Sequence, residues 1–191
     1  MSRHADVRIR SRLLIAIVDY VLEFGLADLT LRPLGAALGV SPRTLLYHFG
    51  SKEELIVAVL EEANRRQLRL LESWYERSAE HDARTLLLRA WQWLTAPRHD
   101  RLLRLIFETG GYALRDRRRY AAFLRRASSD WNATFARALV DRGFSAARAA
   151  SLAIVIVGVI RGLLFEVLAT GDRTSAERAF RSFINAIELP E

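Results

Sequence analysis

The stretch TLRPLGAALGVSPRTLLYHFGSKEEL, residues 30–55, decides the fold of this chain. It contains two short helical patterns, at 31–38 and 42–49, which are separated only by Gly39-Val40-Ser41. A connection this short forces the two helices to cross steeply, and Gly39 supplies the positive φ angle that such a turn needs. The stretch therefore predicts a helix-turn-helix.

Capping residues support these boundaries. Thr30 and Ser41 are suitable N-caps, and Pro42 occupies the first helical position, where proline is favoured. Gly50 ends the second short helix, and Ser51 begins the next helix with a capping box that the residue three positions later, a glutamate, completes. The recognition segment is therefore expected to join the following helix directly.

A helix over 7–24 precedes this stretch and is expected to support it. Six residues form its apolar face: Ile9, Leu13, Ile17, Tyr20, Val21 and Phe24. The residues expected to pack against this face are Leu34, Ala37, Leu38, Leu45 and Phe49, with Val40 filling the angle between the short helices. The opposite face of 42–49 is short, polar and basic, as is typical of a recognition helix in a major groove.

At these residues the chain resembles the TetR family of transcriptional regulators. The closest match to the family pattern is the run Gly39-Val40-Ser41, followed by Leu45, His48, Phe49, Ser51, Lys52, Glu53 and Leu55. The rest of the chain is similar to the family only in being helical and of typical length. A departure occurs at Leu46, where the family usually has a tyrosine that contacts a phosphate. Tyr47 follows, and it either replaces that contact or reaches a base.

The resemblance implies a set of DNA contacts. The candidates are Thr30, Ser41, Pro42, Arg43, Thr44, Tyr47, His48 and Lys52. Lys52 is implied to contact a phosphate, and Arg43 is the best candidate for bidentate recognition of a guanine. Both could instead be ordinary solvated side chains. His48 contacts a phosphate or steadies the helix by packing, and Thr30 caps its helix or touches phosphate.

The rest of the chain is expected to be a helical bundle, which makes the whole fold all-α. Its expected helices are 51–77, 82–96, 99–114, 117–142, 145–170 and 174–188. The expected breaks are at Pro97, Gly143, Gly171 and a capping box of Thr174 and Glu177, and Gly110-Gly111 is a further candidate for a break or kink. The expected domains are a DNA-binding domain at 1–52 and an effector and dimerisation domain at 53–191.

In the TetR family such a bundle binds a small effector and forms a dimer through its last two long helices. The candidates for an effector site are Trp74, Trp91, Trp93, Phe107, Glu108, Tyr112, Trp131 and Phe135. Each aromatic residue could equally belong to the core, and the Glu108 carboxylate needs a partner, either structural or a ligand. The candidates for the dimer interface are Gly158, Gly162, Phe180, Phe183, Ile184 and Ile187.

The composition limits the other possibilities. The formal net charge is +7, which suits a polyanionic partner. A cluster of Arg115, Arg117, Arg118, Arg119, Arg125 and Arg126 is interpreted as a solvated face, or as a surface that attracts an anionic effector. The absence of cysteine excludes disulfides and thiolate metal sites. The four histidines, His4, His48, His81 and His99, lack metal-ligand spacing, so no metal, cofactor or catalytic residue is expected.

Membrane spanning is not expected either. The apolar run 152–160 is interrupted by Arg161 and Glu166 before it reaches the ~20 residues of a transmembrane helix. A cytoplasmic location follows as an expectation.

The sequence thus predicts a homodimeric transcriptional regulator, a repressor that binds a palindromic DNA operator and is released by a small molecule. The alternatives are an activator of the same type, or a general DNA-binding protein without an effector. A peripheral membrane protein is a further alternative, and an enzyme is improbable because no catalytic motif is present.

Overall fold

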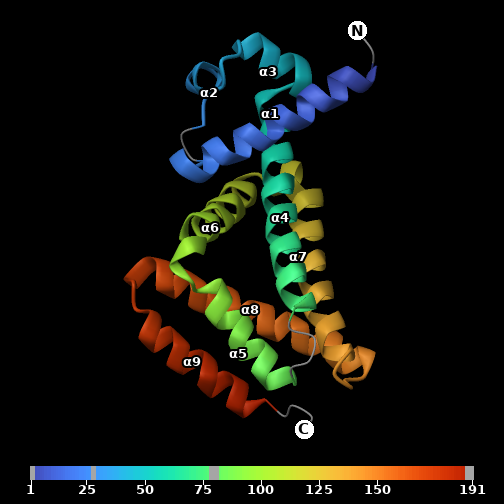
Figure 1. The fold of residues 1–191 in the computed structure, drawn as a ribbon, viewed down its shortest axis with the longest axis vertical. Helices are drawn as coiled ribbons and strands as arrows, with labels where there is room; N and C mark the ends of the chain where they lie inside the picture. Colours follow the sequence, from blue (N-terminus) through green and yellow to red (C-terminus); the bar gives the residue numbers. More distant parts are fainter. Residues whose placement is uncertain (1–2, 27–28, 78–81, 188–191) are drawn as a thin grey trace. The chain divides into compact units, whose positions relative to one another are not determined.

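The computed structural model describes residues 3–26, 29–77 and 82–187. Within these ranges the structure contains helices and no strand, which confirms the predicted all-α class. The helices are α1 (Arg3–Phe24), α2 (Leu31–Leu38), α3 (Pro42–Phe49), α4 (Lys52–Glu76), α5 (Ala83–Leu94), η1 (Pro97–His99), α6 (Asp100–Arg115), α7 (Arg117–Val140), α8 (Ala146–Thr170) and α9 (Arg173–Ala186) (Figure 1).

The chain divides into two compact units. Unit 1 consists of Met1–Gln67 and Arg104–Arg125, and unit 2 consists of Leu68–Leu103 and Arg126–Glu191. Unit 1 therefore contains α1, α2 and α3 together with parts of α4, α6 and α7, whereas α5, α8 and α9 lie wholly in unit 2. This division does not coincide with the domain boundary expected after residue 52.

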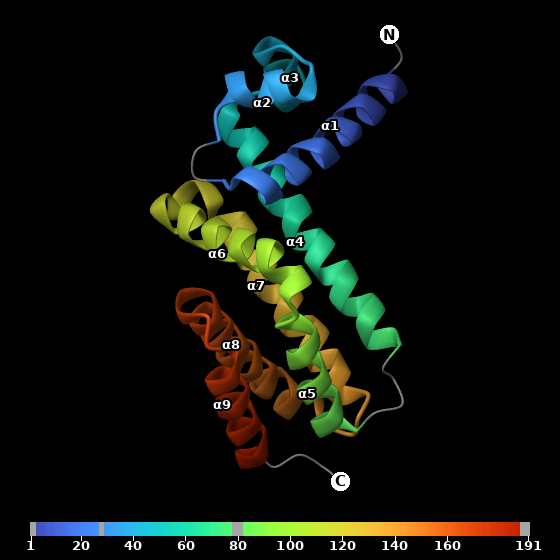
Figure 2. The same cartoon turned by 60° about the vertical axis from the view of Figure 1, so that its left-hand side comes forward.

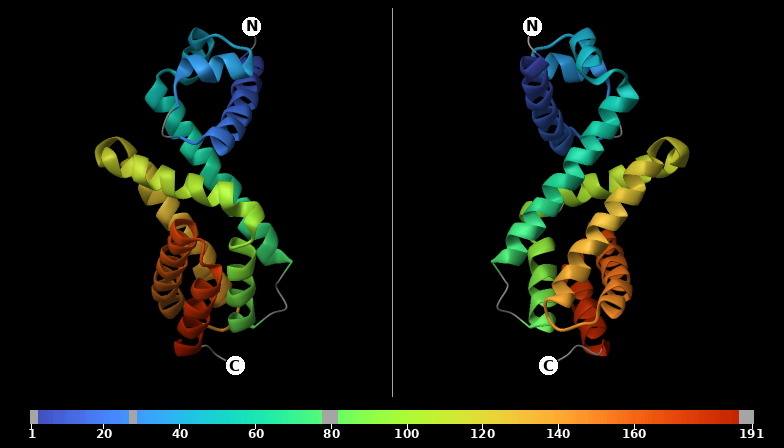
Figure 3. Two further views of the ribbon diagram at one scale, coloured as in Figure 1. Left: turned by 90° about the vertical axis from the view of Figure 1, so that its left-hand side faces the viewer. Right: turned by 90° about the vertical axis from the view of Figure 1, so that its right-hand side faces the viewer.

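The helix-turn-helix of unit 1 packs on α1, and both α2 and α3 contact that helix (Figure 3). Ile17 and Val21 of α1 are buried, as are Leu34, Leu45 and Phe49, all of which were predicted for this core. Leu38 and Val40, also predicted to pack here, are half-buried.

Two residues predicted for this core lie outside it. Phe24 is 63% exposed because it is the last residue of α1, where its ring packs on Tyr20 at 4.6 Å. Leu26, which follows the turn at Gly25, is buried in its place. Ala37 is exposed because α2 turns its neighbours Leu34 and Gly35 inward.

The α2–α3 turn brings two backbone segments into close contact. Gly39 adopts the predicted left-handed conformation, with φ of 65°, and the Val40 N–H donates to the Gly35 carbonyl at 2.9 Å. A Cβ atom on Gly35 would lie 2.6 Å from the Val40 carbonyl oxygen, which is closer than real Cβ contacts allow. Gly35 therefore permits the tight packing of the turn on α2, a role that the sequence did not reveal.

The predicted caps are partly confirmed. Ser41 accepts from the Thr44 N–H at 3.0 Å. The capping box at the start of α4 is complete, because Glu54 N–H donates to the Ser51 hydroxyl at 3.1 Å and Ser51 N–H donates to the Glu54 carboxylate at 3.0 Å. Thr30 occupies the N-cap position of α2, but its side chain makes no capping hydrogen bond.

One expected helix boundary is wrong, and the candidate break at Gly110-Gly111 is absent. The N-cap of α9 is Asp172, whose carboxylate accepts from the Ser175 N–H at 2.9 Å, so the helix starts before the expected box at Thr174. Residue 188, the expected end of this helix, lies outside the described residues. The helix α6 continues through Gly110-Gly111 without a break, since both glycines adopt helical backbone angles there.

Unit 2 is built around α5, α8 and α9, and α9 packs on both of the other two (Figure 2). Trp91 of α5 and Phe180 of α9 are buried, and their rings stack at 4.8 Å. Arg173, the first residue of α9, donates to both carboxylate oxygens of Asp100 at 2.8 and 2.7 Å. These contacts join the start of α9 to the start of α6.

The helix α8 runs through Arg161 and Glu166 to Thr170, in agreement with the helix expected at 145–170. Among the described residues, α8 is the one helix that is long and apolar enough to cross a membrane. One third of its most apolar 18-residue segment, 33%, is buried. Core and interface helices of soluble proteins pass the same test, so this feature is weak evidence for a membrane span.

The close approach at Gly35 gives a testable prediction for stability. Gly35→Ala should lower the free energy of unfolding by about 1–3 kcal/mol, because the new methyl group overpacks the α2–α3 turn. Gly111→Ala is the matched control, since a Cβ there meets nothing within 4 Å, and it should raise stability by about 0.5–1 kcal/mol. Chemical denaturation measures both variants. Equal effects of the two substitutions would contradict this role of Gly35.

Candidate nucleic-acid interface and ligand cavity

The exposed face of α3 carries the candidate base-reading residues. Leu45 and Phe49 are buried, which leaves Arg43 and Tyr47 on the solvent side. Tyr47 is 71% exposed, the most exposed of the large hydrophobic side chains in the described part of the chain. A short helix that presents an arginine and a tyrosine to solvent has the chemistry to meet base edges and phosphates.

The other candidate DNA contacts flank this face. Thr30, Ser41 and Pro42 are exposed, and Thr44, His48 and Lys52 are half-buried. The Ser41 and Thr44 hydroxyls lie 2.8 Å apart and form part of the N-cap of α3, so both already serve the helix end. Leu46, at the position where the resemblance implies tyrosine, is 37% exposed and carries no polar group for a phosphate.

Contacts with α1 hold the far end of α3. The Arg10 Nε donates to the His48 carbonyl at 3.1 Å, and its guanidinium lies 4.9 Å from the centre of the Phe49 ring. The Tyr47 hydroxyl donates to Asp6 at 3.4 Å, a weak bond that DNA could replace. Sequence reasoning missed Arg10, since it is separated from His48 by 38 residues and no local pattern links them.

The start of α4 offers a second point for an anion. Lys52 is the first residue of this helix, where free N–H groups and the helix dipole favour negative charge. The capping box beside it fixes the backbone between α3 and α4, and Gly50 adopts φ of 83° at that point. Lys52 and α3 thus lie on one continuous, well-fixed segment.

Glu108 of α6 has a structural partner. Its carboxylate accepts from the Leu26 backbone N–H at 2.8 Å, directly after the turn at Gly25. Gly25 adopts φ of 84°, and a Cβ there would lie 3.5 Å from the same carboxylate. Within unit 1, Glu108 therefore joins α6 to the end of α1.

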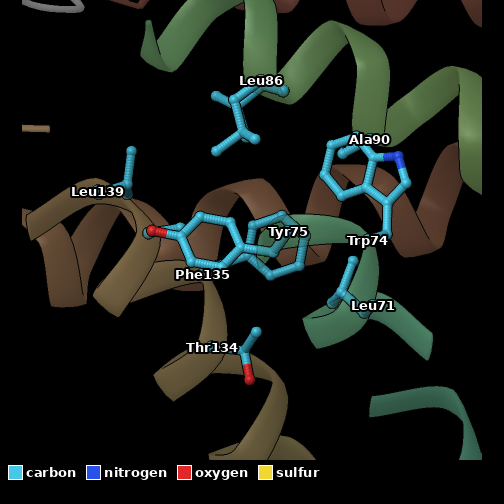
Figure 4. Close-up of a pocket in the computed structure, with 10 residues that line it drawn as sticks. Leu71, Trp74, Tyr75, Leu86, Ala90, Thr134, Phe135 and Leu139 are labelled. Atoms are coloured by element: carbon cyan, nitrogen blue, oxygen red, sulfur yellow. The ribbon is translucent and has the colours of Figure 1, made fainter. Parts of the chain in front are cut away.

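An apolar cavity lies in unit 2 (Figure 4). Its lining residues are Leu71, Trp74, Tyr75, Leu86, Leu87, Ala90, Thr134, Phe135, Ala138 and Leu139. The volume is about 20 Å³, which is enough for a water-sized occupant. A larger ligand would therefore require some of these side chains to move.

The polar groups at this cavity are engaged elsewhere. The Thr134 hydroxyl donates to the Asp130 carbonyl at 3.0 Å, and its oxygen points away from the neighbouring rings in Figure 4. The Tyr75 hydroxyl donates to Asp141 at 2.7 Å and accepts from Arg142 at 3.0 Å. Burial raises the pKa of Tyr75, and the hydrogen bond to Asp141 raises it further, so the phenol stays neutral. The lining is therefore apolar and uncharged.

The eight predicted effector residues are spread over both units. Trp74 and Phe135 line the cavity. The ring centre of Trp93 lies 6.2 Å from that of Trp74, and the ring centre of Trp131 lies 6.5 Å from that of Phe135. Trp91 instead stacks on Phe180. The remaining three, Phe107, Glu108 and Tyr112, belong to unit 1. Sequence reasoning missed most of the lining because its leucines and alanines look like ordinary core residues.

The residues predicted for the dimer interface differ in their burial. Phe180 and Ile184 have no exposed surface and belong to the core of the single chain, while Phe183 and Ile187 are half-buried. Gly158 and Gly162 are exposed, with open space where a Cβ would stand. Beside them on α8, Ile154 and Val155 are 60% and 50% exposed. Among the described residues, no group of histidine and acidic side chains could hold a metal ion.

Comparison with known proteins agrees with this geometry. Residues 16–59, which span the helix-turn-helix and the start of α4, match the family of bacterial regulatory proteins, tetR family. No protein of curated function matches the chain. The chain resembles the multidrug binding protein EbrR, solved with imidazole, at 26% identity over 100% of this chain and 95% of that one, with a TM-score of 0.74.

EbrR has also been solved with proflavin. A TetR-family member from Streptomyces coelicolor A3, SCO1917, shares the fold, with 24% identity over 95% of this chain and 98% of that one and a TM-score of 0.70. The helix-turn-helix, the matching family segment and these full-length fold similarities all agree. Residues 16–59 thus match the DNA-binding segment of the tetR family of bacterial regulatory proteins, and the chain has the fold of TetR-family transcriptional regulators.

Proposed function

We propose that this regulator is a repressor that binds a palindromic operator as a homodimer and leaves it when a small molecule binds. The observation that carries the proposal is the exposed polar face of α3, held between α1 and the capped start of α4. Such a helix can enter a major groove while Lys52 contacts the adjacent phosphate. An activator of the same construction is the second candidate, and location in the cytoplasm is part of the proposal.

In this proposal Arg43 reads a base and Lys52 binds the backbone. Arg43→Ala should weaken binding to the preferred site by about 1–3 kcal/mol and relax one base position. Lys52→Ala should weaken binding to all duplexes alike and reduce the salt slope by about 1. Fluorescence anisotropy on specific and random duplexes separates the two effects. Equal losses of Arg43→Ala on both duplexes would contradict the base contact.

The exposed apolar side of α8 supports the proposed homodimer. Ile154 and Val155 stand beside Gly158 and Gly162, which leave room for the backbone of a second helix. Phe165 of the same helix is 57% exposed. Burying these side chains in a second copy removes apolar surface from water, which is the main source of stability in such interfaces. A two-fold dimer would read a palindrome.

A charge on this side of α8 should separate the subunits. Ile154→Glu is expected to give a folded monomer, because the side chain is already 60% exposed in the single chain. Val140→Glu, at a residue 44% exposed on α7, is the control and should remain a dimer. Sedimentation with circular dichroism distinguishes the species. A native monomer at micromolar concentration, or a dimer of the Ile154→Glu variant, would refute this interface.

The unit 2 cavity supports an uncharged, largely aromatic effector. Trp74, Tyr75 and Phe135 provide ring surfaces, and the nearby polar groups are already hydrogen-bonded. The similar EbrR has been solved with imidazole and with proflavin, which is consistent with binding of small ring compounds. Because the cavity is small, an effector would select a wider conformation, and it acts on DNA binding only through its preference for that conformation.

The helix α4 provides the covalent connection for this coupling. It carries Lys52 at its start and Leu71, Trp74 and Tyr75 near its end. A ligand that displaces these last side chains changes the position of α4, and α3 follows because the connecting residues are fixed by the capping box. In a dimer, both recognition helices must fit the DNA together, so a modest change in their separation costs affinity.

A neutral aromatic dye tests this coupling. N-phenyl-1-naphthylamine, which becomes fluorescent in apolar sites, should bind the native protein and weaken operator binding by about 5- to 150-fold, as a coupling of about 1–3 kcal/mol requires. Trp74→Leu should weaken dye binding several-fold while DNA binding without dye is retained. Binding of the dye without any change in operator affinity would rule out the coupling. Failure of the dye to bind would contradict the proposal that the effector is an uncharged aromatic compound.

A further inference from the structure

Four arginines stand at the turn between α6 and α7, and we call Arg115, Arg117, Arg118 and Arg119 the arginine corner. All four are exposed, and they surround a single acidic residue, Asp116. Asp116 accepts from the Arg119 N–H at 3.1 Å and so caps the start of α7. The corner therefore concentrates positive charge around one carboxylate that already has a structural role.

Most of this charge is not neutralised within the chain. Arg119 forms ion pairs with Asp116 at 3.6 Å and with Glu53 at 4.0 Å. The side chains of Arg115, Arg117 and Arg118 form no hydrogen bond or ion pair with the described residues. Three guanidinium groups are thus available to an external anion.

The position of these arginines is unfavourable for the isolated helix. Arg117, Arg118 and Arg119 form the first turn of α7, where the helix dipole is positive and acidic residues are preferred. Each positive charge at such a site opposes the helix dipole. Arginines placed where they repel one another and the helix dipole indicate that the surface meets an anion when the protein works.

The corner belongs to the same unit as the helix-turn-helix. The Arg119–Glu53 ion pair joins the start of α7 to the first turn of α4, one residue after Lys52. Figures 2 and 3 show the α6–α7 turn projecting on the side of unit 1 that faces away from the N-terminal end of α1. The Arg119–Glu53 ion pair thus places one member of the arginine corner beside the first turn of α4, which carries the proposed phosphate contact Lys52.

We propose that the arginine corner binds the phosphate backbone of double-stranded DNA, beyond the contacts made by α3 and Lys52. Several exposed arginines match a partner with regularly spaced charges better than a small anion, which is usually bound in an enclosed site. Contacts of this kind supply affinity and orientation but carry no base information. The inference rests on the proposed DNA binding and extends it with a second, sequence-independent surface.

The test compares two variants with the same change in charge. Arg115→Gln/Arg117→Gln/Arg118→Gln removes the corner, and Arg89→Gln/Arg98→Gln/Arg101→Gln removes three exposed arginines from unit 2. Binding of the full chain to a duplex selected from a random pool, and to a random duplex of equal length, is measured between about 50 and 200 mM salt. The corner variant should show a salt slope lower by about 1–3 per protomer and should lose about fivefold or more in affinity at low salt.

Both duplexes should lose affinity by the same factor in the corner variant, so the preference for the selected sequence should be unchanged. The control variant should keep the native slope. The melting temperature of the corner variant should be equal to or higher than that of the native protein, because repulsion at the start of α7 is removed.

The other outcomes overturn the proposal. Equal losses in the two variants would assign the effect to net charge, and unchanged binding in the corner variant would show that these arginines do not touch DNA. Loss of binding to anionic phospholipid vesicles, with DNA binding unchanged, would assign the surface to a membrane. If the native protein selects no sequence, the proposed operator fails, while the salt slope on random duplexes still decides the role of the corner.

Discussion

The recognition helix depends on the close approach between α2 and the turn that precedes α3. The turn can pack against α2 only because Gly35 has no side chain, and the left-handed backbone at Gly39 completes the change of direction. Leu34, Leu45 and Phe49 then meet the buried face of α1, and the remaining face of α3 is left polar and exposed. The exposure of Arg43 and Tyr47 is thus a consequence of backbone packing on the opposite side.

A second set of contacts fixes the connection between the helix-turn-helix and α4. The reciprocal hydrogen bonds of Ser51 and Glu54, together with the backbone of Gly50, fix the path from α3 into α4. The same helix, α4, also carries Leu71, Trp74 and Tyr75 of the cavity in unit 2. In unit 1 the hydrogen bond from Leu26 to Glu108 adds a link between α1 and α6.

Local signals in the sequence predicted the helix-turn-helix well. Glycines, prolines and capping residues act over a few positions, so both ends of α2 and α3 and the start of α4 could be predicted from residues 30–55. Side-chain partners far apart in the sequence could not be predicted, as shown by Glu108 with Leu26 and by Arg10 with His48. The same reason applies to Gly35, whose importance depends on the position of the Val40 carbonyl. In unit 2, the predicted effector site consisted of aromatic residues, whereas most of the cavity is lined by leucines and alanines.

In the proposed function, a dimer of this chain reads a two-fold symmetric DNA site through α3. Selection of bound duplexes from a random pool by the full chain, followed by sequencing, tests this claim most directly. A dimer that binds in this way should enrich one palindrome whose half-sites are centred about one helical turn of DNA, or a multiple of it, apart. Enrichment of a single asymmetric site, or of no sequence at all, would contradict it.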